Sequence, residues 1–280
     1  MTLANPSPGL PSPSLETGRT APTVRDESPL ARARRRAMSA FPALLVVAFL
    51  LLPWPLMDKL RAIGSTVCML RPSHSYFLAG QQLPLEARTQ GIYAGLLLGL
   101  GYLLLRRAGA TRRPSRLMMV VLGGFVASMA FDGLNSTAYD VGLPYLYAPT
   151  NFLRLVTGLL AGAALAPALL YLLSISLWDE GQLRPVIGGV GELAGLVLVE
   201  ALFLVAIVFG PGWLLYPISL ITAGGVVVAF FVVTLAVVVS LARDRWSRPL
   251  LINVALLFTV AELGVLVAYK LWFHQCPVPM

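Results

Sequence analysis

Two arginines stand directly before rows of glycines in long apolar stretches of the chain. Arg88 precedes Gly91 by three positions, and Arg154 precedes Gly158 by four. On a helix, residues three or four positions apart lie on one face, so each arginine is expected on the face that its glycines occupy. An ionised side chain at this position needs a partner or a water-filled cavity. The two arginines are therefore the first candidates for a functional site.

Carboxylate and amide side chains lie near these arginines. We predict that Asp132, in the segment FDGLNS, pairs with Arg154, Arg88 or both. Two interpretations stay open: a structural ion pair that fixes helix register, and a site for a polar ligand. The expected polar cluster comprises Arg88, Asp132, Asn135, Asn151 and Arg154, with Tyr93 and Glu86 as neighbours and Asp140 as a further carboxylate.

The composition shows which elements must position this cluster. Of the 280 residues, 57% are hydrophobic and 12% are charged, whereas soluble domains have roughly 45–50% apolar and about 25% charged residues. The apolar residues form blocks of roughly 17 to 25, the length of a helix that crosses a bilayer. We therefore predict an all-α, polytopic transmembrane bundle with seven spans, at residues 41–57, 89–105, 117–131, 151–173, 188–209, 218–241 and 249–272.

The distribution of basic residues predicts the orientation. Cytoplasmic loops carry the excess of lysine and arginine, and most of the 21 such residues fall on the inner side if the N-terminus is cytoplasmic. The C-terminus is then outside, and we expect a multi-pass protein of a prokaryotic inner (plasma) membrane. Three parts are expected: a disordered cytoplasmic tail with a basic anchor at 1–37, a four-span half with the polar cluster at 38–173, and a three-span scaffold half at 174–280.

Glycines at four-residue spacing mark two of the spans. Small residues on one stripe let membrane helices approach closely. The stripe forms either inside one chain or at a homodimer interface. The glycines concerned are Gly91, Gly95 and Gly99 in one span, and Gly158 and Gly162 in another.

Three glutamates lie within the later spans: Glu192, Glu200 and Glu262. A buried carboxyl without a cation tends to be neutral and to hydrogen-bond between helices. A proton relay or cation pathway is the alternative interpretation. No row of such residues crosses the whole bilayer, which favours neutral carboxyls that hydrogen-bond between helices.

The chain has two cysteines, too few for a four-thiolate metal centre. Cys68 and Cys276 both fall on the expected outer side, where a disulfide between them would be permitted. With His74 and His274 they would supply two thiolates and two imidazoles, but the four residues lack the spacing of a metal motif. Unpaired thiols, no metal and no cofactor are therefore expected.

Several short pieces follow one another in a specific order: Cys68, Ser75-Tyr76-Phe77, Pro84, Ala87-Arg88, Gly91-Ile92-Tyr93-x-Gly95, Asp132-Gly133, and Thr150-Asn151-x-x-Arg154-x-x-Thr157-Gly158. With these pieces, residues from about 67 to 165 resemble the bacterial and archaeal membrane-protein family catalogued as domain of unknown function 2085. The resemblance implies a shared fold and a shared polar site. Met69-Leu70 replaces the family's His-Gln, and Glu86 and Thr89 replace its Cys-x-x-Cys pair, so thiol-based metal or redox chemistry is not expected here.

These features favour a binding or assembly role for an uncharacterised integral membrane protein. The alternatives are a secondary transporter or channel for a small polar or anionic solute, and a membrane-embedded enzyme with a degenerate metal or redox motif. Catalysis is not expected, because the chain has no recognised catalytic motif. The expected partners are the lipid bilayer and either another membrane protein or a second copy, and not nucleic acid.

Overall fold

The computed structural model describes residues 29–178 and 181–273, with side chains from residue 38 onward. The contacts divide the chain into two units, Met1–Ala37 and Met38–Met280. The account below concerns the second unit. Most of the tail predicted at 1–37, and both Cys276 and His274, lie outside the described residues. The predicted division of the second unit at residue 173 stays a prediction.

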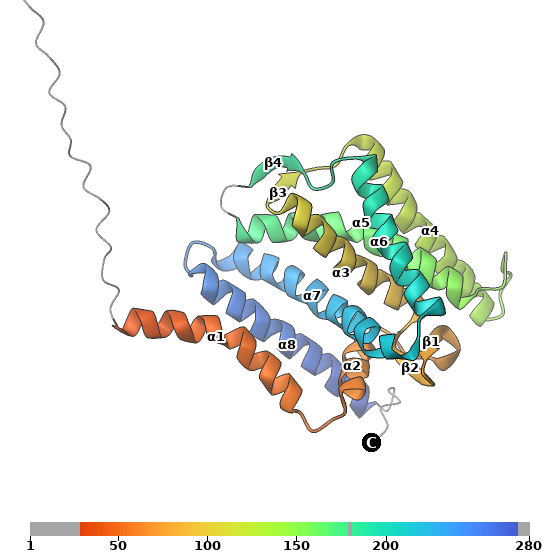
Figure 1. Cartoon of the computed structure of the whole chain (residues 1–280), viewed down its shortest axis with the longest axis horizontal. Coiled ribbons are helices and arrows are strands. Elements are labelled where there is room, and N and C mark those ends of the chain that lie inside the picture. The colour runs from red at the N-terminus through yellow and green to blue at the C-terminus, as the bar shows by residue number, and fades with distance from the viewer. Residues whose placement is uncertain (1–28, 179–180, 274–280) are drawn as a thin grey trace, which may run out of the picture. The chain divides into compact units, whose positions relative to one another are not determined.

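The described chain is mainly helical (Figure 1). Two short 3-10 turns and two small sheets lie between the helices. The elements are α1 (Pro29–Leu51), α2 (Leu56–Ser65), β1 (Ser75–Leu78), β2 (Gln81–Glu86), α3 (Ala87–Arg107), β3 (Ala110–Arg112), α4 (Arg116–Asp140), α5 (Asn151–Leu177), β4 (Gln182–Pro185), α6 (Val190–Phe209), α7 (Leu215–Ala242) and α8 (Arg248–Trp272).

Within the described residues, five helical segments are long and apolar enough to cross a membrane: α4, α5, α6, the segment 212–242 that contains α7, and α8. The pair formed by residues 38–51 of α1 and by α2 makes a sixth if it is one broken span. The helix axis bends by 111° between the two members of that pair. Pro53 and Pro55 lie at the bend and interrupt the helix. A multi-pass helical membrane protein is thus supported. Helix α3, which corresponds to the predicted span 89–105, is not among these segments.

The two glycine rows face each other inside the chain, between α3 and α5. A Cβ added at Gly158 would meet the carbonyl oxygen of Arg88, and one added at Gly91 would come 2.5 Å from the carbonyl oxygen of Leu155. At the next turn, a Cβ at Gly162 would lie 2.8 Å from the Cα of Gly95. The backbones of α3 and α5 therefore touch along this glycine seam, which no larger residue would allow.

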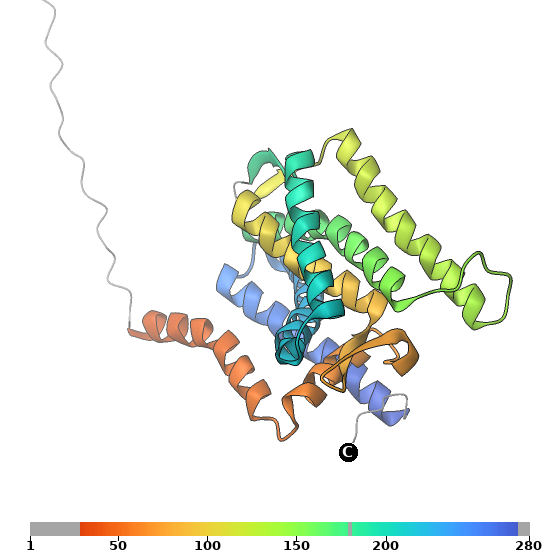
Figure 2. The same ribbon diagram turned by 45° about the vertical axis from the view of Figure 1, so that its right-hand side comes forward.

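Helix α4 lies at the edge of the bundle, beside α5 (Figure 2). It extends to Asp140, nine residues beyond the end of the predicted span 117–131. The helix continues because Asp132, Asn135 and Ser136 recur at helical spacing and are all buried. Much of the rest of α4 is exposed and apolar, as on a helix that faces lipid.

A β-hairpin between α2 and α3 was not predicted. Strands β1 and β2 pair antiparallel, joined by Ala79 and Gly80, whose φ angles are 50° and 76°. Two positive φ values are what a two-residue hairpin turn requires. Leu83 and Leu85 of β2 are fully buried, so the hairpin is held against the bundle directly before α3 begins. The second sheet, parallel β3–β4, lies beyond the opposite end of α3.

The glycine seam generates a test of packing. We expect Gly158→Ala to lower the free energy of unfolding by roughly 1–3 kcal/mol, because the added methyl group overlaps the Arg88 carbonyl oxygen. The measurement is unfolding of the detergent-solubilised chain by SDS titration, followed by circular dichroism. Gly123→Ala on α4 is the matched control, since no atom lies within 4 Å of its Cβ position. Equal losses in both variants would contradict the seam.

Candidate functional site: a polar cleft at the ends of α3, α4 and α5

An ion pair between Arg88 of α3 and Asp132 of α4 lies at the centre of the polar residues. Arg88 Nη2 and Asp132 Oδ2 are 2.5 Å apart, and the Asp132 side chain is 2% exposed. The same nitrogen donates to Ser136 Oγ at 2.8 Å and to the Asp132 carbonyl oxygen at 3.2 Å. The predicted partner of Asp132 is thus Arg88. Arg154 instead pairs with Asp140, at 3.8 Å.

The Asp132 carboxylate also accepts hydrogen bonds from two other elements. Thr157 Oγ1 of α5 lies 3.3 Å from Oδ2, and the Tyr147 hydroxyl donates to Oδ1 at 2.8 Å. Burial of the phenol, together with its bond to this carboxylate, raises the pKa of Tyr147 to about 12. The phenol therefore stays a donor, and Asp132 joins α3, α4, α5 and the α4–α5 loop.

Two asparagines position the loops around this ion pair. Asn135 accepts from the backbone N–H of Leu146 at 2.8 Å and donates to the Tyr147 carbonyl at 2.9 Å. Asn151, the first residue of α5, donates to the carbonyl oxygens of Ser73 and Ser75 at 3.1 and 3.3 Å. Asn151 Oδ1 also accepts from Arg154 Nη1 at 3.2 Å. Asn135 therefore fixes the α4–α5 loop to α4, and Asn151 fixes the segment before β1 to the start of α5.

A cleft of about 90 Å³ opens beside the ion pair, and we call it the polar cleft. Its lining comes from the loop before β1, the β2–α3 junction, α4 and α5: Arg71, His74, Glu86, Arg88, Thr89, Ser136, Thr137, Asp140 and Arg154.

The remaining ion pairs of the cleft are longer than that of Arg88. Arg71 lies 3.4 Å from both Glu86 and Asp140. His74 lies between the same two carboxylates, with Nδ1 4.0 Å from Glu86 and Nε2 3.6 Å from Asp140. The side chains of Arg71, Glu86 and Asp140 are therefore joined by long hydrogen bonds, and the Arg71 backbone N–H also donates to Glu86 Oε1 at 2.9 Å.

His74 is neutral more readily than an ordinary histidine. Burial lowers its pKa from the usual 6.5, and the positive charges of Arg154 and Arg71 lower it further, against the opposing effect of Asp140 and Glu86. The neutral imidazole keeps one donor and one acceptor nitrogen in the cleft.

Several of the predicted site residues lie elsewhere. Tyr93 lines a separate groove beside α7. Glu192, at the first turn of α6, pairs with Arg107 Nη2 at 2.7 Å. Glu200 is 2% exposed, and neither of its carboxyl oxygens has a hydrogen-bond partner within the described residues. Glu262 accepts a hydrogen bond from the hydroxyl of Thr234. None of these carboxyls lines the polar cleft.

Arg71, Ser136, Thr157 and Tyr147 were missed by the sequence reasoning. Thr157 was quoted only as part of the family resemblance, although it stands three residues after Arg154 and so shares its helix face. Arg71 and Tyr147 lie in loops, where no periodicity indicates direction. Their roles depend on how the loops fold.

Of the two cysteines and two histidines considered together in the sequence, the structure describes only Cys68 and His74. Cys68 Sγ lies 3.3 Å from the Gly64 carbonyl oxygen, while Cys276 and His274 lie outside the described residues. Within the described residues, no three histidine, cysteine or acidic side chains are placed to hold a metal ion.

Comparison with known proteins shows which part of the chain resembles a described family. Residues 68–167 match a family described as "Predicted membrane protein (DUF2085)". The resemblance seen in the sequence is therefore confirmed. The chain is also 31% identical over 104 residues to an uncharacterised protein of Methanocaldococcus jannaschii, a match that covers 37% of this chain and 61% of that protein. No solved structure matches the chain.

The matched segment contains the whole lining of the polar cleft. Glu86 and Thr89, the positions at which the sequence was noted to depart from the pattern it resembles, both line the cleft.

The geometry generates a test of the ion pair by a double-mutant cycle. We expect Arg88→Ala and Asp132→Ala to be coupled by roughly 1–3 kcal/mol, because each single change leaves a largely buried charge unpaired. Arg154→Ala and Asp132→Ala should be coupled more weakly, because Arg154 forms no direct ion pair with Asp132 and interacts with it at longer range. The free energies of unfolding come from SDS titration. A larger coupling for the Arg154 pair would contradict the assignment.

The lowered pKa of His74 generates a test by pH. As pH falls through about 6.5, the unfolded chain binds a proton at His74 that the folded chain does not yet bind, so stability must fall with pH there. His74→Gln removes this contribution. We expect a smaller drop in Tm between about pH 8 and about pH 5.5 for the variant than for the parent chain. An equal or larger drop would show that His74 is not the group concerned.

Proposed function

We propose that this protein binds a small polar solute in the polar cleft, as a binding or accessory protein of a prokaryotic inner membrane. The observation that carries the proposal is the arrangement of Arg71, Arg154, Glu86 and Asp140. These two cations and two carboxylates face one cleft at separations of 3.4 to 3.8 Å. Arg88 and Asp132, by contrast, are paired with each other at a shorter distance.

The charge balance supports a solute with no net charge. With Arg88 and Asp132 paired and His74 neutral, two positive and two negative groups remain. A net anion would face Glu86 and Asp140 as well as the arginines, at a repulsive cost. A small zwitterion places its carboxylate beside the guanidinium groups and its ammonium beside the carboxylates. The cleft volume of about 90 Å³ suits a solute of a few non-hydrogen atoms.

The proposed membrane orientation puts this cleft at the outer face. The N-terminal ends of α3 and α5 meet there, while the opposite end of α3 carries Arg106 and Arg107 and is followed by the basic strand β3. Such a concentration of arginine is typical of the cytoplasmic side. We accordingly propose seven spans, with α3 and the broken α1–α2 pair counted, a cytoplasmic N-terminus and an external C-terminus.

Transport receives less support than binding. A transport path requires polar residues that continue from the cleft toward the other side. Glu200 and Glu262, the carboxyls deep enough to extend such a path, both lie outside the cleft. Glu200 is enclosed, and Glu262 lies on a separate groove. These positions favour a binding site that does not continue as a path through the membrane.

Glycine is the probe for this proposal. We expect the full chain in detergent to bind glycine in isothermal titration calorimetry, and Arg71→Gln to weaken binding about tenfold or more, because a charge-assisted hydrogen bond is lost. Arg71 is half exposed, so its replacement should leave Tm nearly unchanged. Arg112→Gln, an exposed arginine of β3 beyond the other end of α3, is the matched control.

Acetate and methylammonium, each with one of the two charges, should bind more weakly than glycine. Unchanged glycine binding in Arg71→Gln would overturn the proposal. Absence of binding by all three probes, together with a lowered Tm in Arg71→Gln, would assign the cleft a purely structural role.

A further inference from the structure

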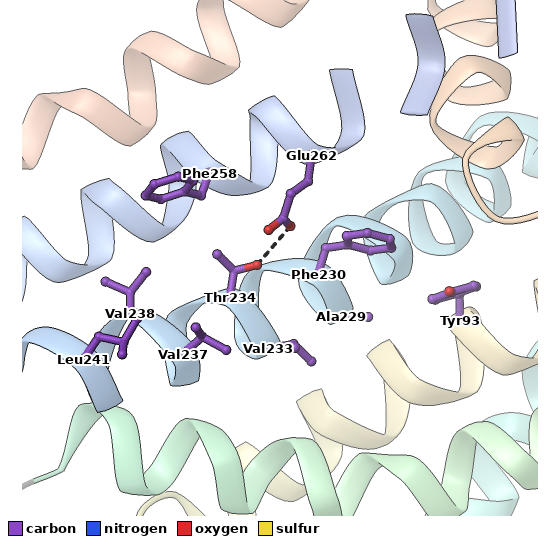
Figure 3. Close-up of a pocket in the computed structure, with 10 residues that line it drawn as sticks. All are labelled: Tyr93, Ala229, Phe230, Val233, Thr234, Val237, Val238, Leu241, Phe258 and Glu262. Atoms are coloured by element: carbon purple, nitrogen blue, oxygen red, sulfur yellow. Dashed lines mark hydrogen bonds between the residues drawn. The ribbon is translucent and has the colours of Figure 1, made fainter. Parts of the chain in front are cut away.

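A second hollow lies between α7 and α8, beside Tyr93 of α3 (Figure 3). Its volume is about 630 Å³, and it shares no lining residue with the polar cleft. Sites for small organic ligands commonly have volumes of roughly 300–1,000 Å³, with apolar walls and few polar groups. Here the walls are apolar apart from Thr234, Glu262 and the hydroxyl of Tyr93. We call this hollow the α7–α8 groove.

Glu262 is the unusual feature of the groove. It lies near the middle of α8, an apolar helix long enough to cross a membrane, yet its side chain is exposed. An ionisable group at this depth is costly and indicates a function unless a partner covers it. Thr234 Oγ1 of α7 donates to Glu262 Oε2 at 3.0 Å. A carboxylate has about four acceptor positions, so most of its capacity remains available.

Aromatic rings flank this carboxylate along the groove. Phe258 stands four residues before Glu262 on α8, and Phe230 stands four residues before Thr234 on α7. Because α7 and α8 are consecutive and antiparallel, the two rings lie on opposite sides of the Glu262–Thr234 pair, as Figure 3 shows. The faces of such rings attract cations within about 6 Å. Within the described residues, none of the ion pairs includes Glu262.

We propose that the α7–α8 groove binds a lipophilic organic cation. The Glu262 carboxylate neutralises the positive charge, and Phe230, Phe258 and the apolar walls contact the hydrocarbon body of the ligand. Val233, Val237 and Leu241 on the wall are exposed, so the groove opens toward the lipid when α7 spans the membrane. A lipophilic cation concentrates in bilayers and enters from that side. A neutral lipid chain would leave the carboxylate uncompensated.

The test uses tetraphenylphosphonium as the probe and the full chain purified in detergent. Equilibrium dialysis should show binding to the parent chain, weakened at least tenfold in Glu262→Gln, which removes the negative charge and keeps the side-chain shape. Glu200→Gln is the matched control, because it changes another intramembrane carboxyl that does not line the groove. Binding to this control should equal that of the parent chain.

Two further measurements separate charge recognition from simple partition into an apolar space. Tetraphenylborate, with the same shape and the opposite charge, should bind at least tenfold more weakly than the cation. Phe258→Leu, which keeps the wall apolar but removes a ring, should weaken binding severalfold and provides the test if Glu262→Gln does not fold.

Equal cation affinity in the parent chain and in Glu262→Gln would overturn the proposal. So would equal binding of the two tetraphenyl ions. A parent chain that binds no cation but is dimeric, with a monomeric Glu262→Gln, would assign the groove to a second copy of the chain instead.

Discussion

The close approach of α3 and α5 is the constraint on which the polar site depends. Gly158 allows the α5 backbone to contact the carbonyl oxygen of Arg88, so the start of α3 is held at a fixed distance from α5. Arg88 then extends its side chain to Asp132 of α4, which Thr157 of α5 also contacts. A peripheral, lipid-exposed helix is thereby attached to the core by a charged contact. This matters because the hydrophobic effect does not hold helices together within lipid.

The same constraint explains why the cleft stays open. The Asp132 carboxylate accepts hydrogen bonds from Arg88, Thr157 and Tyr147, and the α4–α5 loop is held by Asn135. Asp140, two turns farther along α4, is therefore placed 3.4 Å from Arg71 and 3.8 Å from Arg154. The short ion pair holds the framework, and the longer ion pairs beside it are the ones that the proposed solute would contact.

Helical periodicity was enough to predict that the glycine rows pack closely, inside one chain or between two copies, and that Arg88 and Arg154 share faces with them, because both follow from spacing along one helix. It did not predict that the two rows face each other. The pairing of Arg88 with Asp132 was one of the alternatives considered. The sequence did not reveal the β1–β2 hairpin, the length of α4 or the place of Arg71 in the cleft. Each of these depends on contacts between segments far apart in the chain. Tyr93 was expected beside the polar cluster because it is near Arg88 in sequence. It lies instead on a different face of α3, toward α7.

The positions of the intramembrane carboxyls agree better with the two separate sites proposed above than with one continuous path. The Cβ position of Gly95 lies 3.0 Å from Glu200 Oε1, so Glu200 is enclosed against the glycine seam. Glu192 is neutralised by Arg107 at the end of α6 that follows β4. Glu262 faces a groove formed by other helices. To reach Glu200 along the glycine seam, a solute would have to separate α3 from α5, whose backbones are in contact. A core packed through its backbone resists such opening, and its ligands are then expected at its surfaces, one at the polar end and one at the lipid-facing side.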